Sequence, residues 1–315
     1  MTEQIATREA YGQTLLELGD MMKKIVVLDA DLSKSTRTVL FAERFPARFF
    51  NMGIAEADMM GTAAGLAAEG YIPFASTFGV FATGRSYDQI RNTIAYPRLN
   101  VKIAASHTGI TVGEDGASHQ TLEDIAIMRV LPNMTIVAPA DGMQTREAVK
   151  AIVSFDGPVY LRLGRLAVPR VIPEGTPFKL GKGQVLLEGD DLLIVAVGMM
   201  TGLGLTAAKI LQEEGIRATV VNMHTIKPLD EELLIRMARK TGAVVTAEEH
   251  SIIGGLGSAV SELLAENCPV PVVKVGVRDV FGESGTPAAL LQKYGLTQES
   301  IAQAGKRALK LKKAF

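Results

Sequence analysis

The sequence is poor in cysteine, since its 315 residues include only Cys268. One thiol cannot form an intramolecular disulfide, and the surrounding ENCPVP holds no second thiol or histidine at metal-ligand spacing, so we expect Cys268 to be structural. The first residues, MTEQIATREAYGQ, lack the basic and apolar regions of a secretion signal, and no apolar run approaches the roughly 18–20 residues that cross a bilayer. These absences exclude a disulfide-rich secreted protein and a membrane protein, and they lead us to expect a cytoplasmic location.

An excess of either charge is also missing. The chain has 33 Lys and Arg residues against 34 Asp and Glu residues, and it shows no basic stripe of the kind that binds nucleic acid. The motifs GxxxxGKS, GxxxxGKT, HExxH and GxSxG are absent too, which excludes the common nucleotidase, zinc protease and esterase classes. We therefore expect neither nucleic acid nor a membrane as a partner, and we look for a small-molecule site.

What the sequence does contain is a regular alternation of short apolar runs with helix-length segments. The runs IVVLDAD, NVKIAASH and PVYLRLGR are separated by segments such as DMMGTAAGLAAEG and GMQTREAVKAIVSF. This alternation predicts a mainly parallel sheet with helices on both faces. A second series of the same kind includes DLLIVAVG, ATVVNMHTI and GAVVTAEEH. We therefore predict an α/β protein of two domains, as the length of the chain also indicates.

A stretch rich in proline and glycine separates the two series. It includes VIPEGTPFKLGKG and shows no helical period, so we expect it to connect the domains. The predicted boundaries are a first domain over residues 1–170, a linker over residues 171–189 and a smaller α/β domain over residues 190–315.

Polar residues follow the predicted strands of the first domain. Open parallel sheets bind ligands beyond the carboxyl ends of their strands, because loop amides and helix N-termini converge there. The side chains that could line one crevice at this edge are Asp31, Ser33, Glu56, Thr77, His107 and Arg165.

Glu56 stands where an apolar strand ends and an apolar helix begins, within NMGIAEADMMGTAAG. The helix dipole alone could stabilise a carboxylate in this first turn. Alternatively, a poorly solvated carboxyl group at this position could exchange a proton with a bound heterocycle. The residue types by themselves leave both interpretations open.

Aromatic and titratable residues follow in the next two segments. STFGVFATGRSYDQIRN places Phe78 and Phe81 three residues apart, so a helical segment would put both rings on one face, either in the core or stacked on a flat ligand. SHTGITVGEDGASHQ then carries His107, Asp115 and His119 between glycines that let the backbone approach a ligand. Three such residues on one loop favour a polar small-molecule site.

Five motifs in this order resemble the pyrimidine-binding domain of transketolase. They are ADLSKS, NMGIAEA, FASTFGVFATGRSYDQIRN, SHTGITVGEDGASHQ and GPVYLRLGR, and residues 190–312 resemble the C-terminal domain of the same family. The resemblance covers nearly the whole chain. It implies an enzyme that uses thiamine diphosphate to transfer a two-carbon ketol unit from a ketose to an aldose, and we expect the sugars to be phosphorylated.

Carried over motif by motif, the resemblance also implies a role for individual residues. Glu56 would hydrogen-bond N1′ of the aminopyrimidine ring, and Glu56 and His119 would be the catalytic residues. The residues that bind the cofactor would be Asp31, Glu56, Phe78 and Phe81. His119 and Asp115 would contact the hydroxyl groups of the sugar. The residues that hold its phosphate end would be Arg8, Ser35, His107 and Arg165, and Arg162 would be a further substrate-binding residue.

One part of the family pattern is missing. The diphosphate-binding domain of the family carries a GDG motif and, further along, an Asn-rich metal motif, whereas GDD at residues 189–191 opens a strand and has no such sequel. The resemblance therefore implies one half of a split transketolase, with no metal ligands of its own and with a partner chain that supplies the Mg²⁺ and diphosphate site. This partner would be an N-terminal transketolase subunit, which carries the diphosphate-binding domain. We expect a homodimer of the present chain within a heterotetramer that also contains the partner.

Three other functions compete with this one. The similar 1-deoxy-xylulose-5-phosphate synthases share the residue type of Arg162 but usually carry an Asp-Arg pair where this chain has SHTG. The β chain of a 2-oxo acid dehydrogenase has the same two-domain plan but gives no reason for GEDGASHQ. A non-catalytic binding subunit is disfavoured because Glu56 is present.

Overall fold

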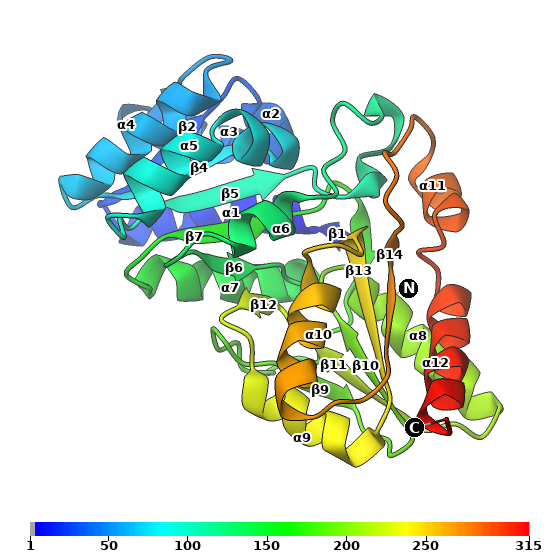
Figure 1. Cartoon of the computed structure of the whole chain (residues 1–315). Coiled ribbons are helices and arrows are strands. Elements are labelled where there is room, and N and C mark those ends of the chain that lie inside the picture. The colour runs from blue at the N-terminus through cyan, green and yellow to red at the C-terminus, as the bar shows by residue number, and fades with distance from the viewer. Residues whose placement is uncertain (1–3, 315) are drawn as a thin grey trace.

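The computed structural model describes residues 4–314, which form two α/β domains lying side by side (Figure 1). The first domain is built on a seven-stranded sheet with the order β12-β6-β7-β5-β4-β2-β3. All of its neighbouring strands are parallel except β12, which is antiparallel to β6. The strands are β2 (Ile25–Asp29), β3 (Phe49–Asn51), β4 (Ile72–Phe78), β5 (Lys102–Ser106), β6 (Thr135–Val137), β7 (Val159–Arg162) and β12 (Thr225–Lys227).

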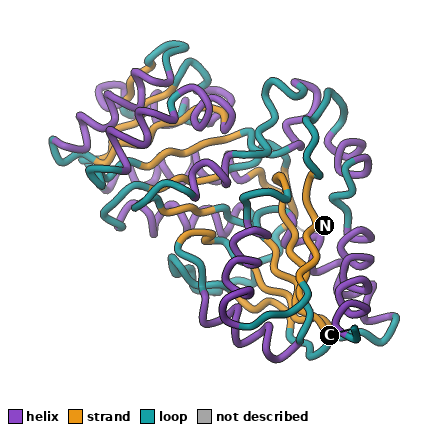
Figure 2. Tube along the Cα trace, in the orientation of Figure 1, coloured by secondary structure: helices purple, strands orange, loops and turns teal. Residues whose placement is uncertain are grey.

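Helices cover both faces of this sheet, and so the predicted fold class is confirmed (Figure 2). Helices α1, α3 and α7 pack on one face, and α4 and α6 pack on the other. The central strands β2, β4, β5, β6 and β7 are mostly apolar because both of their faces are buried, and each enclosed Leu, Ile or Val contributes roughly 1.5–3 kcal/mol. The helices are α1 (Thr7–Met21), α2 (Ser33–Thr36), α3 (Val39–Arg44), α4 (Glu56–Ala68), α5 (Tyr87–Gln89), α6 (Asp124–Arg129) and α7 (Gly142–Ser154), and the short turns are η1 (Pro46–Arg48), η2 (Phe81–Arg85), η3 (Ile90–Ala95) and η4 (Ile110–Asp115).

The second domain has a five-stranded sheet with the order β14-β13-β10-β11-β9. Helices α9 and α10 pack on one face and α8 and α12 on the other. Local signals set the helix ends: the Asp230 carboxylate accepts from the backbone N–H of Leu233 at the start of α9, and Gly242 ends that helix in the left-handed conformation. The elements are β9 (Gln184–Leu187), β10 (Leu192–Ala196), α8 (Met200–Glu213), β11 (Ala218–Asn222), α9 (Glu231–Thr241), β13 (Val244–Ser251), α10 (Leu256–Asn267), β14 (Val272–Val277), α11 (Pro287–Lys293) and α12 (Gln298–Lys312).

Two strands lie in sheets that the predicted domain boundaries did not assign to them. Strand β12 belongs by sequence to the second series but extends the first sheet, and β9 lies inside the expected linker yet pairs with β11. A third, two-stranded sheet pairs β1 (Gln4–Ala6) with β8 (Ala167–Pro169), which brings the two ends of the first domain together. One apolar cluster also runs from α4 and α6 into α9 and α10. The domains therefore share a continuous interior. Within residues 4–314, no helix is both long and apolar enough to cross a membrane.

Candidate active site

The expected site residues gather where β2, β4 and β5 reach their carboxyl ends. Asp31 lies just beyond β2, Phe78 is the last residue of β4, and His107 directly follows β5. These strands are parallel neighbours, so their ends open on one edge of the sheet. The pairing of β1 with β8 brings Arg8 and Arg165 close enough to affect the charge on His107.

A stack of flat rings forms the centre of this edge. Phe78 and Phe81 stack with centroids 5.8 Å apart and planes 10° apart, and His107 stacks on Phe78 at 3.8 Å. His119 meets the Phe81 ring edge-on at 5.4 Å. Phe78 ends a strand and Phe81 opens the π-helical turn η2, so the two phenylalanines are not on one helical face as their spacing suggested. Their rings are nevertheless adjacent, and Phe81 is only partly buried.

Glu56 is the first residue of α4 and is only 4% exposed. Its Oε1 accepts a hydrogen bond of 2.9 Å from the guanidinium of Arg85, which is itself about half exposed. The same guanidinium lies 4.1 Å from the centre of the Phe81 ring. Arg85 therefore joins the carboxylate to the ring stack, which places Glu56 in the same group of residues.

His107 is buried in a conformation that few residues other than glycine adopt. Its φ is 54°, and its side chain is held between the Ser106 hydroxyl at 3.0 Å from Nδ1 and the Arg8 guanidinium at 3.4 Å from Nε2. Burial and the positive charges of Arg8 and Arg165, together with His119, lower the pKa of His107 to about 3. The imidazole is thus neutral at physiological pH, and the backbone strain at this position is typical of a functional site.

We expect His107 to make stability depend on pH. Unfolding restores an ordinary histidine pKa near 6.5. Below pH 6.5, His107 therefore binds a proton in the unfolded chain but stays neutral in the folded chain. The free energy of unfolding should fall as pH drops from about 6.5 towards 3, by at most about 1.4 kcal/mol per pH unit.

The measurement is denaturant unfolding at several pH values on the parent and on His107→Asn. Burial lowers the pKa of His224 to about 4, so His224 also makes the folded chain less stable as the pH falls. His107→Asn should therefore lose only part of the dependence of unfolding free energy on pH. An unchanged slope in His107→Asn would show that His107 titrates normally in the folded chain.

Three polar residues of the expected phosphate end lie around His107. Arg8 donates a hydrogen bond of 2.8 Å to the backbone carbonyl of Ser35. The Ser35 hydroxyl takes no part in this contact. Arg165 donates to the carbonyl of Val112 and pairs with Glu114 at 3.2 Å. The result is a pair of guanidinium groups beside one imidazole, an arrangement suited to an anion.

The remaining loop residues are more open. Asp115 ends the turn η4 and is exposed, whereas His119 is half-buried and its Nδ1 lies 3.0 Å from the Ser118 hydroxyl. Asp31 is exposed with a φ of 62°, and it exchanges hydrogen bonds of 3.2 Å with Asn51 through its backbone N–H and its carboxylate. Asp31 therefore holds the loop after β2 against β3.

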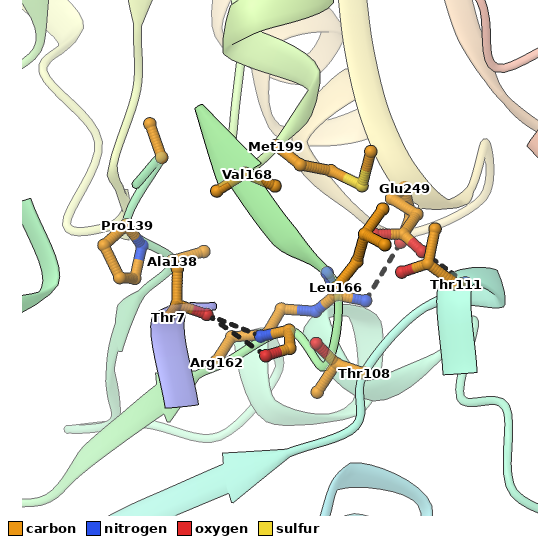
Figure 3. A pocket seen from close by; sticks show the side chains of 13 residues that line it. Thr7, Thr108, Thr111, Ala138, Pro139, Arg162, Leu166, Val168, Met199 and Glu249 are labelled. Atoms are coloured by element: carbon orange, nitrogen blue, oxygen red, sulfur yellow. Dashed lines mark hydrogen bonds between the residues drawn. The ribbon is translucent and has the colours of Figure 1, made fainter. Parts of the chain in front are cut away.

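Arg162 does not join this group. It is buried at the domain boundary, where its guanidinium donates bonds of 2.7 and 3.1 Å to the Asp124 carboxylate. It also donates one of 3.0 Å to the backbone carbonyl of Glu249 (Figure 3). Burial alone would lower the pKa of Arg162, but the Asp124 carboxylate raises it above its usual range. Arg162 is therefore engaged in an ion pair inside the first domain and in one hydrogen bond to the second, whereas its expected contact with the substrate stays a prediction.

Two family models match the chain, one for each half of it. The transketolase pyrimidine-binding domain matches residues 3–170, and the transketolase C-terminal domain matches residues 181–301. A putative transketolase C-terminal section from Methanocaldococcus jannaschii is 52% identical over 299 residues, which is 94% of each protein. The chain belongs to the transketolase family. The predicted family and the predicted half of it, pyrimidine-binding plus C-terminal domain, are thereby confirmed.

Solved and curated members of the transketolase family extend this match. A structure described as "Split gene transketolase, inactive beta4 tetramer" is 62% identical, with a TM-score of 0.92, and the match covers 98% of this chain and 99% of that one. A 6-deoxy-6-sulfo-D-fructose transketolase subunit from Clostridium sp. is 48% identical over 94% of this chain and 92% of that protein. A 1-deoxy-D-xylulose-5-phosphate synthase from Geobacter sulfurreducens is 41% identical over 93% of this chain but only 46% of its own length.

Several residues of this transketolase-family site were missed in the sequence. Arg85 contacts Glu56, Asn51 holds Asp31, and Asp29 accepts from the hydroxyls of Thr36 and Thr38 at 2.6 and 2.8 Å. Asp29 is completely buried, and burial raises its pKa. A charged residue inside the apolar run IVVLDAD was the available signal for Asp29, whereas nothing local distinguishes Arg85 from other surface arginines.

Proposed function

We propose that this chain is the pyrimidine-binding subunit of a split transketolase and transfers two-carbon units from a ketose to an aldose together with a partner chain. The observation that carries the proposal is a buried carboxylate, Glu56, placed next to a stack of three flat rings. A helix-dipole role requires no aromatic neighbours, whereas proton exchange with a bound heterocycle requires both a poorly solvated carboxyl group and a flat surface.

The residues around Glu56 fit the aminopyrimidine ring of thiamine diphosphate. Phe81 offers a partly exposed ring face, and Phe78 supports it from the strand end. Oε1 of Glu56 is engaged by Arg85, and no described residue donates a hydrogen bond to Oε2, which is therefore available to a ligand. We assign the diphosphate and Mg²⁺ ligands to the partner chain, in keeping with relatives that are named as subunits or as a split-gene enzyme.

When bound, thiamine diphosphate supplies a carbon nucleophile that accepts the two-carbon unit and passes it on. The chain's own residues orient the reactants and move protons. Glu56 exchanges a proton with N1′ of the pyrimidine ring. His119, which is half-buried at the edge of the ring stack, faces the hydroxyl groups of the sugar together with Asp115. His107 stays neutral because of its low pKa, so it can accept as well as donate a hydrogen bond there.

We further propose that the substrate carries an anionic group at the end remote from the reacting carbon. Arg8 and Arg165 place two positive charges beside His107. Two relatives are named for sugars with a terminal anion, a sulfonate in one and a phosphate in the other. A guanidinium recognises either group through charge-assisted, often bidentate hydrogen bonds.

Replacing Arg165 with alanine should therefore raise KM for a sugar phosphate by roughly ten- to a hundredfold and leave kcat nearly unchanged. The contact is far from the reacting carbon, and losing a hydrogen bond to a charged group costs about 1.5–3 kcal/mol. Steady-state kinetics of the reconstituted enzyme with fructose 6-phosphate as donor measures this effect. Arg170→Ala is the control, because Arg170 is also a half-buried arginine but pairs with Glu174 away from His107. A parental KM in Arg165→Ala would mean that this arginine does not bind the substrate.

The split-enzyme proposal also predicts weak cofactor binding by the chain alone. The pyrimidine ring is a small part of thiamine diphosphate, and the charged diphosphate and its Mg²⁺ would find their ligands only on the partner chain. Isothermal titration calorimetry with thiamine diphosphate and Mg²⁺ should therefore show no tight binding to the purified chain and clear binding after the partner is added. A Kd below about 1 µM without a partner would contradict the proposal.

We propose, finally, that copies of this chain associate as a homodimer within a heterotetramer. The structural relative described as a β4 tetramer supports self-association by chains of this kind.

A further inference from the structure

The stretch that carries His107, Asp115 and His119, residues 106–121, has almost no regular structure of its own, and we call it the histidine loop. Three of its glycines, Gly109, Gly113 and Gly116, have positive φ angles, and its helical content is limited to the irregular turn η4. A segment of this kind takes its position from the contacts around it.

The C-terminal domain makes the contact that fixes the start of η4. Oε1 of Glu249, near the end of β13, accepts a hydrogen bond of 2.7 Å from the backbone N–H of Thr111. Figure 3 shows Glu249 reaching from its strand to Thr111 across the domain boundary. Glu249 is only 6% exposed and Thr111 is also buried. Because water does not reach this N–H, the carboxylate of Glu249 satisfies it.

The fit between Glu249 and the histidine loop is close. A Cβ atom added at Gly109 would collide with the Glu249 carboxylate, so this glycine is required by the contact as well as by its φ of 82°. Glu249 is itself held in place, because Arg162 donates to its backbone carbonyl at 3.0 Å. The ion pair of Arg162 with Asp124 thereby anchors the strand end from which Glu249 reaches the loop.

Two further contacts from the same domain hold the other end of the loop. Gln120 donates to the carbonyl of Glu283 at 2.9 Å, and the N–H of Ser251 donates at 2.7 Å to the carbonyl of Leu122, directly after the loop. Helix α11 packs against η4. The histidine loop is thus held from the C-terminal domain at the start of η4 and near its C-terminal end, while His107 belongs to the ring stack of the first domain and His119 lies against it.

We propose that Glu249 is a positioning residue of the active site, through which the C-terminal domain sets the shape of the histidine loop. This inference rests on the proposed function for its kinetic consequence, but its structural consequence can be measured on the chain alone. Glu249 acts through the hydrogen bond that it accepts from Thr111. The position of its acceptor oxygen therefore matters, whereas its charge does not.

The test uses two variants that separate contact from charge. Glu249→Asp keeps the charge but withdraws the acceptor by one methylene, whereas Glu249→Gln keeps an acceptor oxygen in place and removes the charge. Glu248→Asp is the matched control, because Glu248 is an equally buried neighbour whose carboxylate accepts from Leu256 and Gly257 inside its own domain.

Hydrogen exchange of the purified chain is the first measurement. In Glu249→Asp, the backbone amides of residues 109–116 should exchange roughly tenfold faster than in the parent, whereas Glu249→Gln should match the parent. Glu248→Asp should lower Tm without speeding exchange in the loop. Parental exchange in Glu249→Asp, fast exchange in Glu249→Gln, or equally fast exchange in Glu248→Asp would each overturn the proposal.

Kinetics of the reconstituted enzyme is the second measurement, with fructose 6-phosphate as donor. Glu249→Asp should raise KM on the order of tenfold with kcat within about threefold of the parent, and Glu249→Gln should restore the parental KM. If the parent enzyme itself transfers no two-carbon unit, the proposed function fails while the exchange result still decides the role of Glu249. An unchanged KM in Glu249→Asp alongside a mobile loop would contradict the positioning role.

Discussion

Replacing Glu56 with glutamine is expected to slow two-carbon transfer by the reconstituted enzyme by about 10²–10⁴-fold. An amide keeps the shape of the side chain and can still bond to Arg85 through its oxygen, but it cannot exchange a proton with a ring nitrogen. The loss should therefore appear in kcat, while folding and association with the partner chain stay as in the parent. Steady-state rates at saturating substrate and cofactor measure it.

Asp58 offers a matched control for this experiment. It lies in the same first turn of α4 but is exposed, so Asp58→Asn removes a similar interaction with the helix dipole without touching the ring stack. Such an interaction is worth roughly 0.3–1 kcal/mol of stability and should not affect the rate. A folded Glu56→Gln enzyme that keeps more than about a third of the parental kcat would contradict the catalytic role, because packing changes alone can produce so small an effect.

Removing the Asp124 carboxylate is expected to cost about 3–5 kcal/mol of folding free energy, among the largest losses that a single substitution can cause here. Asp124 is completely buried and takes two bonds from Arg162 and one of 2.7 Å from the Tyr160 hydroxyl. Burial would raise the pKa of Asp124, but the Arg162 charge holds it below its usual range. Asp124→Ala therefore leaves a guanidinium charge inside the protein without its partner.

Urea unfolding of the parent and Asp124→Ala measures this cost. The double variant Asp124→Leu with Arg162→Met should recover much of the stability, because replacing both charges with apolar groups removes the unpaired charge. A single variant as stable as the parent, or a double variant no more stable than the single, would show that the unpaired Arg162 charge is not what destabilises Asp124→Ala.

Local signals in the sequence were sufficient to predict the α/β fold. Fully buried parallel strands are mostly apolar, so runs such as IVVLDAD indicate them directly. The crossing of β12 into the first sheet could not be found in this way. Strand β12 joins the first sheet by pairing with β6, far away in the chain, and pairing of that kind leaves no pattern in either segment.

The candidate site was predictable to a similar extent. Glu56 and Phe78 mark the ends of regular elements, where a polar or aromatic residue stands out against an apolar run. Arg162 stands in an equally suggestive place, but its partner Asp124 is 38 residues away, so only the folded chain distinguishes an ion pair from a ligand contact. The contact of Glu249 with Thr111 spans 138 residues and was likewise invisible in the sequence.

Mixing this chain with its partner subunit in the presence of thiamine diphosphate and Mg²⁺ tests the central claim most directly. The measurement is transfer of a two-carbon unit from fructose 6-phosphate to glyceraldehyde 3-phosphate, followed by the appearance of the new ketose phosphate. We expect no transfer by either chain alone and sustained turnover by the mixture. Turnover by this chain without a partner would contradict the account, as would a mixture that transfers no two-carbon unit but forms a 1-deoxyketose phosphate and CO2 when it is supplied with pyruvate and glyceraldehyde 3-phosphate.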